Sequence, residues 1–153
     1  KHLAPREARR LARLHLPDLS DQVLADPDLL HAPLGAVVAR TEFGLTDPAI
    51  LRAVSLHTTG AAAMSDLELL VFLADKAEPS RQYPQAERIR RMALSDPRKA
   101  VRTCLEELVR HLGALGLPPH PDTLAGLADL GRPPIPLSTD TNPETQERRE
   151  ILT

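Results

Sequence analysis

Helix-start signals recur along this chain of 153 residues, and they constrain its fold more than any other feature. Ser65 is followed three residues later by Glu68, a capping box in which hydroxyl and carboxylate each satisfy a free amide at a helix start. Asp47-Pro48 and Asp96-Pro97 each pair an N-cap residue with a proline suited to the first helical turn. The chain is therefore expected to be all-α.

The composition favours the same fold class. Aromatic residues make up 2% of the chain and hydrophobic residues 42%, so Leu, Ala, Val and Ile must build the core. No alternating run of β-branched and aromatic residues reaches strand length between turn signals. Helices are predicted over residues 5–15, 19–25, 29–42, 47–57, 65–76, 84–95, 97–114 and 121–130.

One domain is expected over residues 1–131, because this length suffices for a core of its own. Residues 132–153 are rich in proline and polar side chains and are predicted to be an exposed tail. The formal net charge of −2 argues against a nucleic-acid-binding face, and no apolar run has membrane-spanning length. The single cysteine, Cys104, is predicted to be a small buried hydrophobe. These features fit the reducing cytoplasm and leave the oligomeric state open, a homo-oligomer included.

Three side chains that can bind a metal fall on or near predicted apolar helix faces. Asp75 shares a stripe with Leu67 and Val71, and a carboxylate that faces a core needs a cation, a metal or hydrogen-bond donors opposite it. His57 ends the apolar stripe that starts at Ile50 on the preceding helix, and His31 stands at the start of the helix before that. Each alone is also compatible with a hydrogen-bonded structural residue. The conjunction of two histidines and one aspartate on consecutive helices favours a shared site.

Four motifs in series resemble those of the YqeK-type HD-domain hydrolases, over about residues 1–130. They are Leu30-His31-Ala32-Pro33-Leu34-Gly35-Ala36, Leu56-His57-Thr58-Thr59-Gly60, Phe72-Leu73-Ala74-Asp75-Lys76 with Glu78-Pro79 and Arg81, and His120-Pro121-Asp122-Thr123-Leu124. The resemblance implies an HD-domain helical bundle that binds a divalent metal, iron in the first place, with manganese or zinc as alternatives. It also implies symmetrical hydrolysis of diadenosine tetraphosphate to two ADP.

The resemblance assigns roles to individual residues. Asp75 corresponds to the family's last metal ligand. His57 and His31 would line the same pocket, either completing a second metal position or meeting substrate phosphate, and they are the candidates for a catalytic role. Arg81 corresponds to the family's phosphate-contacting arginine. The implied substrate contacts are Lys1, His31, His57, Thr58, Arg81, His120, Pro121, Asp122 and Thr123.

The family's other metal ligands, a histidine on an early helix and an adjacent His-Asp pair, have no counterpart in this sequence. In the family a Lys or Arg follows the pair within a few residues, so Lys1 resembles that residue and a segment upstream of it is expected. Whether these residues alone can catalyse turnover is therefore open. Two other interpretations remain: an HD phosphohydrolase that acts on another nucleotide, and a non-catalytic helical interaction module.

Overall fold

The computed structural model describes residues 3–80 and 85–131, and within these ranges it contains helices and no strand. The helices are α1 (Pro5–His15), α2 (Asp21–Ala25), α3 (Pro27–Phe43), α4 (Pro48–Leu56), α5 (Asp66–Ala77), α6 (Ala86–Ser95), α7 (Pro97–Ala114) and α8 (Pro121–Leu130). Each lies within two residues of a predicted range, so the all-α prediction is confirmed. None of the described helices combines the length and hydropathy of a membrane span. The predicted tail over 132–153 lies outside the described residues.

The helices begin where the sequence signals predicted. Ser65 Oγ accepts a hydrogen bond from the Glu68 amide, and the Glu68 carboxylate accepts one from the Ser65 amide at 2.8 Å, which completes the capping box. The carboxylates of Asp47 and Asp96 likewise accept backbone amides in the first turns of α4 and α7. Local capping chemistry thus fixes the starts of three helices.

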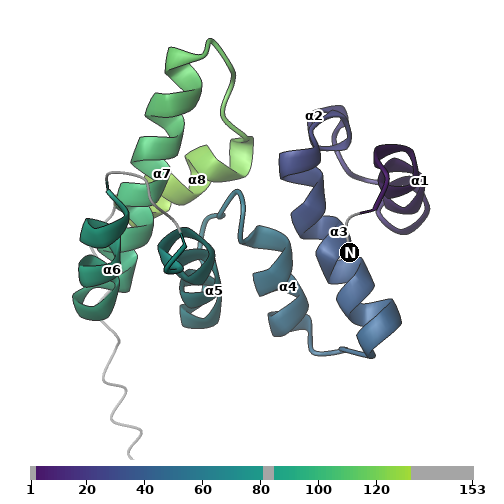
Figure 1. The fold of residues 1–153 in the computed structure, drawn as a ribbon, viewed down its shortest axis with the longest axis horizontal. Helices are drawn as coiled ribbons and strands as arrows, with labels where there is room; N and C mark the ends of the chain where they lie inside the picture. The colour runs from purple at the N-terminus through teal and green to yellow at the C-terminus, as the bar shows by residue number, and fades with distance from the viewer. Residues whose placement is uncertain (1–2, 81–84, 132–153) are drawn as a thin grey trace, which may run out of the picture.

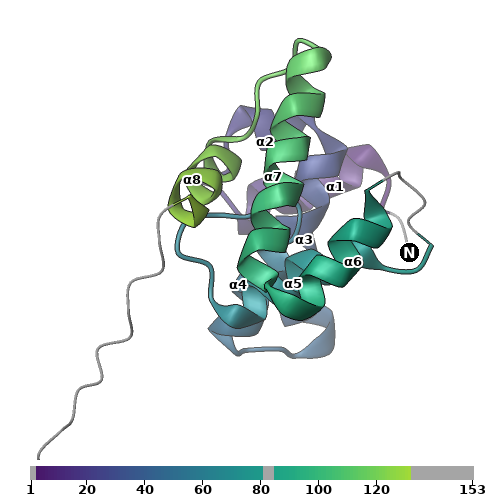
Figure 2. The same cartoon turned by 90° about the vertical axis from the view of Figure 1, so that its left-hand side faces the viewer.

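Helix α4 lies between two groups of helices (Figure 1). In the first group α1 and α2 pack against α3, and in the second group α7 packs against α5, α6 and α8. Helix α4 contacts α3 on one side and α5 on the other. Seen from the side of the second group, α7 runs in front of α1 to α3 (Figure 2). The molecule is therefore two helical groups joined through α4.

Each group has its own apolar cluster. The larger one belongs to α5 to α8 and includes Phe72, Ile89 and Leu105, each at most 1% exposed. The smaller one is built on Ala12, Val23 and Leu30. Cys104 is buried in the larger cluster, as predicted, and this burial raises the pKa of its thiol from 9.0 to about 12.

The predicted core face of α5 was wrong. Its buried residues are Glu68, Leu69, Phe72 and Leu73. Leu67 and Leu70 are 40% and 55% exposed, and the Asp75 side chain is 31% exposed rather than turned into the core. The stretch from Leu67 to Ala74 is apolar nearly all round the helix, so residue spacing alone could not select the buried face.

The predicted stripe of α4 was also wrong at its start. Ile50 is 36% exposed, and Ala53 is the buried residue of this helix. His57 follows the helix as its C-cap residue and is half-buried.

Candidate functional site

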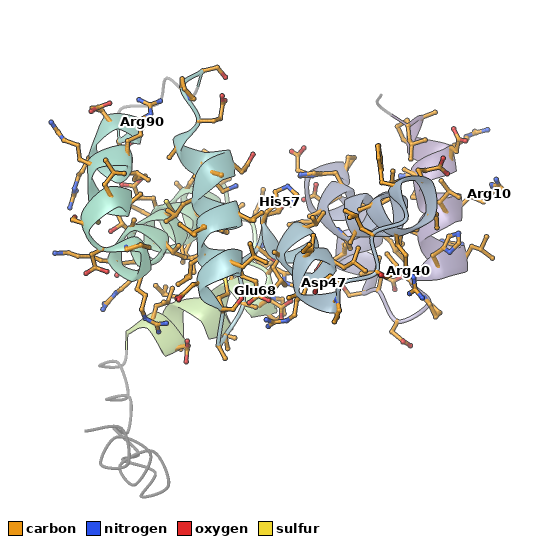
Figure 3. All side chains as sticks on the ribbon, turned by 90° about the horizontal axis from the view of Figure 1, so that it is seen from below. Arg10, Arg40, Asp47, His57, Glu68 and Arg90 are labelled. Carbon is orange, nitrogen blue, oxygen red and sulfur yellow. The ribbon has the colours of Figure 1, made fainter. Side chains whose placement is uncertain are left out.

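The two histidines singled out by the sequence lie in contact. His31 comes from α3 and His57 from the end of α4, and their Nε2 atoms are 2.9 Å apart. The ring centroids are 4.9 Å apart with an interplanar angle of 66°. Thr58 Oγ1 lies 3.4 Å from the same nitrogen of His31. Figure 3 shows His57 in the middle of the molecule, where the two helical groups meet.

The end of α4 determines which nitrogen of His57 carries hydrogen. His57 Nδ1 lies 2.6 Å from the backbone oxygen of Val54, and a carbonyl oxygen can only accept. Nδ1 therefore donates, and in the neutral ring Nε2 keeps a lone pair that points toward His31. A carbonyl partner on the far ring nitrogen is also the usual support of a metal-binding histidine.

Neutral imidazole nitrogens are common metal ligands, so the two histidines are residues that would hold a divalent cation together. In the neutral pair, His31 Nε2–H donates to His57 Nε2. In the part of the chain that the structure describes, no group of three or more His, Cys, Asp or Glu side chains could hold a metal. The described residues do not bring Asp75 into a three-ligand group with the two histidines.

Asp75 lies near the end of α5 beside Lys76. Lys76 Nζ is 3.0 Å from Asp75 Oδ2 and 5.4 Å from the centroid of the Phe72 ring. The Asp75 side chain is 31% exposed and the Lys76 side chain is 28% exposed, so both can reach solvent or a ligand. Lys76 belongs to the predicted Asp75 motif but was not itself predicted as a site residue.

A cavity of about 480 Å³ opens beside Thr58, between the two groups of helices. Basic and hydroxyl-bearing side chains line one part of it: Thr58, Thr59, Lys76, His111, His120 and Thr123. Leucines form an apolar wall: Leu29, Leu108, Leu112, Leu115 and Leu117. Gln22, Asp26, Asp28 and Pro118 complete the lining, so the cavity offers charged groups of both signs and hydrogen-bonding groups next to an apolar surface.

His120 has the opposite tautomer from His57. It is the N-cap residue of α8, and its Nδ1 accepts the backbone N–H of Asp122 at 3.2 Å. In the neutral ring the hydrogen is therefore on Nε2, which can donate. The side chain is 15% exposed and lines the cavity. The site thus has a lone pair at His57 and a donor at His120.

The remaining predicted residues are placed differently from one another. Thr123 is 1% exposed, and its hydroxyl donates to the backbone oxygen of Thr59 at 2.8 Å. Pro121 and Asp122 form the exposed first turn of α8. Lys1 and Arg81 lie outside the described residues.

No model of a known protein family matches the chain. Over 119 residues it is 41% identical to a protein of Halalkalibacterium halodurans named symmetrical bis(5'-nucleosyl)-tetraphosphatase, a match that covers 78% of this chain and 63% of the relative. A Bacillus subtilis protein of the same name is 35% identical over 98 residues, which are 64% of this chain and 53% of the relative. The chain thus spans less than two thirds of the length of these curated relatives.

A solved structure shares the fold. It is a crystal structure from Clostridium acetobutylicum, described as an HD superfamily hydrolase involved in NAD metabolism, with a TM-score of 0.79 and 26% sequence identity. The match covers 84% of this chain and 68% of that one. The resemblance to the YqeK-type HD-domain hydrolases is thereby confirmed: the chain is a homologue of bacterial proteins named symmetrical bis(5'-nucleosyl)-tetraphosphatase and has the fold of an HD superfamily hydrolase.

Proposed function

We propose that this chain forms the nucleotide-facing part of a metal-dependent hydrolase that cleaves diadenosine tetraphosphate symmetrically into two ADP. The contact between His31 and His57 carries the proposal, because two imidazole nitrogens 2.9 Å apart suit a bound cation or, when protonated, a phosphate, and the adjacent Thr58 lines the cavity. The names of the curated relatives support the choice of substrate. Residues 1–131 would form this domain and residues 132–153 a tail.

Asp75, His57 and His31 are the residues that would contribute to holding a divalent metal. Imidazole and carboxylate ligands suit iron, which we propose first, and also manganese or zinc. Such an ion, when bound, activates water and neutralises phosphate oxygens. The hydrogen bond from His57 Nδ1 to the Val54 backbone oxygen keeps the lone pair on Nε2, where it is available to the ion.

The cavity supplies contacts for a phosphate chain and a nucleoside. His120 Nε2–H and the Thr58 hydroxyl can donate to phosphate oxygens, and the Lys76 ammonium adds a positive charge. The leucine wall offers an apolar surface for a base. At about 480 Å³ the cavity has the size of a small-ligand site, so it would take one nucleotide half of the substrate. We assign Arg81 and Lys1 to phosphate on their sequence positions, and Pro121, Asp122 and Thr123, in the first turn of α8, to the segment that closes the site.

The test uses the full-length gene product, metal and diadenosine tetraphosphate, with the nucleotide products separated by chromatography. Symmetrical cleavage yields ADP alone. His57→Ala should lose bound metal and lower kcat/KM by at least about 100-fold, because it removes the lone pair that the end of α4 fixes. His15→Ala, the same change at an exposed histidine on α1, is the matched control and should retain both.

Three results would contradict the proposal. Equal amounts of ATP and AMP would show asymmetrical cleavage. A higher kcat/KM for a nucleoside di- or triphosphate would show an HD phosphohydrolase with another substrate. A full-length protein that binds no metal and turns over no nucleotide would be a helical interaction module.

A further inference from the structure

Helix α8 is fixed to the loop that follows His57. This loop, residues 58–65, joins α4 to α5. Three residues of α8, each three positions after the last, contact its backbone: Thr123, Gly126 and Asp129. Residues at this spacing lie on one face of a helix, so α8 presents one face to the loop.

Thr123 makes the contact nearest to His57. Its hydroxyl donates to the Thr59 backbone oxygen at 2.8 Å, and the two residues are 1% and 8% exposed. A carbonyl that is this well shielded would be left without a partner if the hydroxyl were removed. The Thr123 hydroxyl is thus committed to the loop.

Gly126 allows the helix backbone to lie directly on the loop backbone. A Cβ atom at this position would be 2.8 Å from the carbonyl oxygen of Ala61 and 3.1 Å from its carbonyl carbon. Backbone atoms cannot rotate away as a side chain can, so any larger residue would push α8 and the loop apart.

Asp129 makes the third contact. Its Oδ2 accepts the Ala63 amide at 3.2 Å, and Arg98 lies 3.8 Å from the same oxygen. Ala63 has a φ of 52°, in the left-handed region that L-residues with a side chain rarely adopt. The carboxylate thus holds a strained part of the loop in place.

The loop is short enough to transmit this contact to His57. Thr59 stands two residues after His57, and the Gly60 amide donates back to the Leu56 carbonyl at 2.8 Å. We propose that Thr123, Gly126 and Asp129 are positioning residues that hold the 59–63 backbone and thereby keep His57 Nε2 opposite His31 Nε2. This refines the role of Thr123 from a substrate contact to a support of the histidine pair.

The test begins with the histidine pair itself, in metal-free protein. In the NMR spectrum the ring protons of His31 and His57 should show a mutual nuclear Overhauser effect, because the ring centroids are 4.9 Å apart. Thr123→Val keeps the side-chain shape and removes the donor, and it should abolish this signal and shift the Thr58 amide. Thr123→Ser keeps the donor and should restore both.

Gly126→Ala should likewise abolish the signal, and its matched control is Gly113→Ala on α7, where an added Cβ meets no atom within 4 Å. Asp129→Ala alters a partly exposed position and should weaken the signal without unfolding the protein, so the proposal stays testable if Thr123→Val does not fold. An unchanged signal and an unchanged Thr58 shift in the folded variants would overturn the inference.

A second measurement rests on the proposed function and uses diadenosine tetraphosphate. Thr123→Val should lower kcat by roughly 10–100-fold and change KM less than about 3-fold, because misplaced groups slow the reaction more than they weaken binding. A rise in KM at constant kcat would mean that Thr123 contacts substrate, and the inference would fail. If the wild-type protein hydrolyses no diadenosine tetraphosphate, the proposed function fails while the NMR result still decides the inference.

Discussion

The carboxylate of Glu68 is predicted to be one of the larger single contributors to stability outside the apolar core. Its side chain is 3% exposed, and Figure 3 shows it on α5. Oε2 accepts the Ser65 amide at 2.8 Å, and Oε1 accepts a hydrogen bond from Arg52 on α4. The same carboxylate thus caps α5 and ties it to the helix that carries His57.

The expected loss for Glu68→Ala follows from these contacts. A capping hydrogen bond contributes about 0.5–1.5 kcal/mol and a charge-assisted one about 1.5–3 kcal/mol. The lower end applies to the second contact, because Arg52 is 48% exposed and regains water when its partner is removed. Loss of the buried methylenes adds about 1 kcal/mol. The total is roughly 3–4 kcal/mol.

Arg52→Ala is expected to cost about 1–3 kcal/mol although the arginine is half exposed. It leaves a buried carboxylate that keeps the hydrogen bond from the Ser65 amide and loses the one from the guanidinium. The double variant should therefore lose less than the sum of the two single losses.

The assay is equilibrium unfolding in urea, read by circular dichroism at 222 nm, with the same slope required for all variants. The matched control is Glu106→Ala, which breaks the 2.9 Å pair between Arg102 and Glu106. Both of its members are more than 40% exposed, so the loss should stay within about 0.5 kcal/mol. If Glu68→Ala loses no more stability than Glu106→Ala, or if the Arg52 and Glu68 losses are simply additive, burial is not what gives this contact its strength.

Three further predictions concern the larger apolar cluster. Leu105 has 0% exposure, so Leu105→Ala should lower the unfolding free energy by about 2–5 kcal/mol. Leu94 is 91% exposed, so Leu94→Ala should change it by less than about 0.5 kcal/mol. Equal losses in urea unfolding would contradict the assignment of the core. Burial raises the pKa of Cys104 to about 12, so alkylation at pH 8 should be about 1,000-fold slower in the native than in the unfolded protein, and rapid native labelling would contradict it. The pKa of the Cys104 thiol is higher in the folded protein than in the unfolded one, so the protonated thiol stabilises the fold below about pH 9 and this contribution is lost as the pH rises toward 12. Urea midpoints measured from about pH 8 to 11 should therefore fall as the pH rises.

The helix positions could be predicted because their signals are local. Asp47-Pro48, Asp96-Pro97 and the Ser65 capping box each act within a few residues, and no tertiary contact reverses them. The meeting of His31 and His57 was also within reach, since they were assigned to consecutive helices and expected to share a site. The core face of α5 was not, because a helix that is apolar on most sides carries no periodic signal.

Contacts between distant residues were missed for a different reason. Thr123 and Thr59 are separated by 64 positions, and Arg52 and Glu68 by 16. Nothing in the spacing of a threonine or a glutamate indicates which distant backbone or charge it will meet. His120 is an intermediate case: its position before Pro121 allowed a cap, but its tautomer follows only from the observed bond to Asp122.

The arrangement of two apolar clusters around α4 has a consequence for how the protein responds to ligands. Proteins open locally in cooperative units, and a unit held by a small cluster opens at a lower free energy than one held by a large cluster. The unit of α1 to α3, built on Ala12, Val23 and Leu30, is the weaker one, and it contributes His31. A ligand that needs His31 and His57 together binds only while this unit is closed, so binding favours the closed state by mass action. Substrate or metal would then stabilise the packing of α1 to α3 against the rest of the fold. The apparent affinity for the ligand would be lowered by the free energy needed to bring this unit into its closed state.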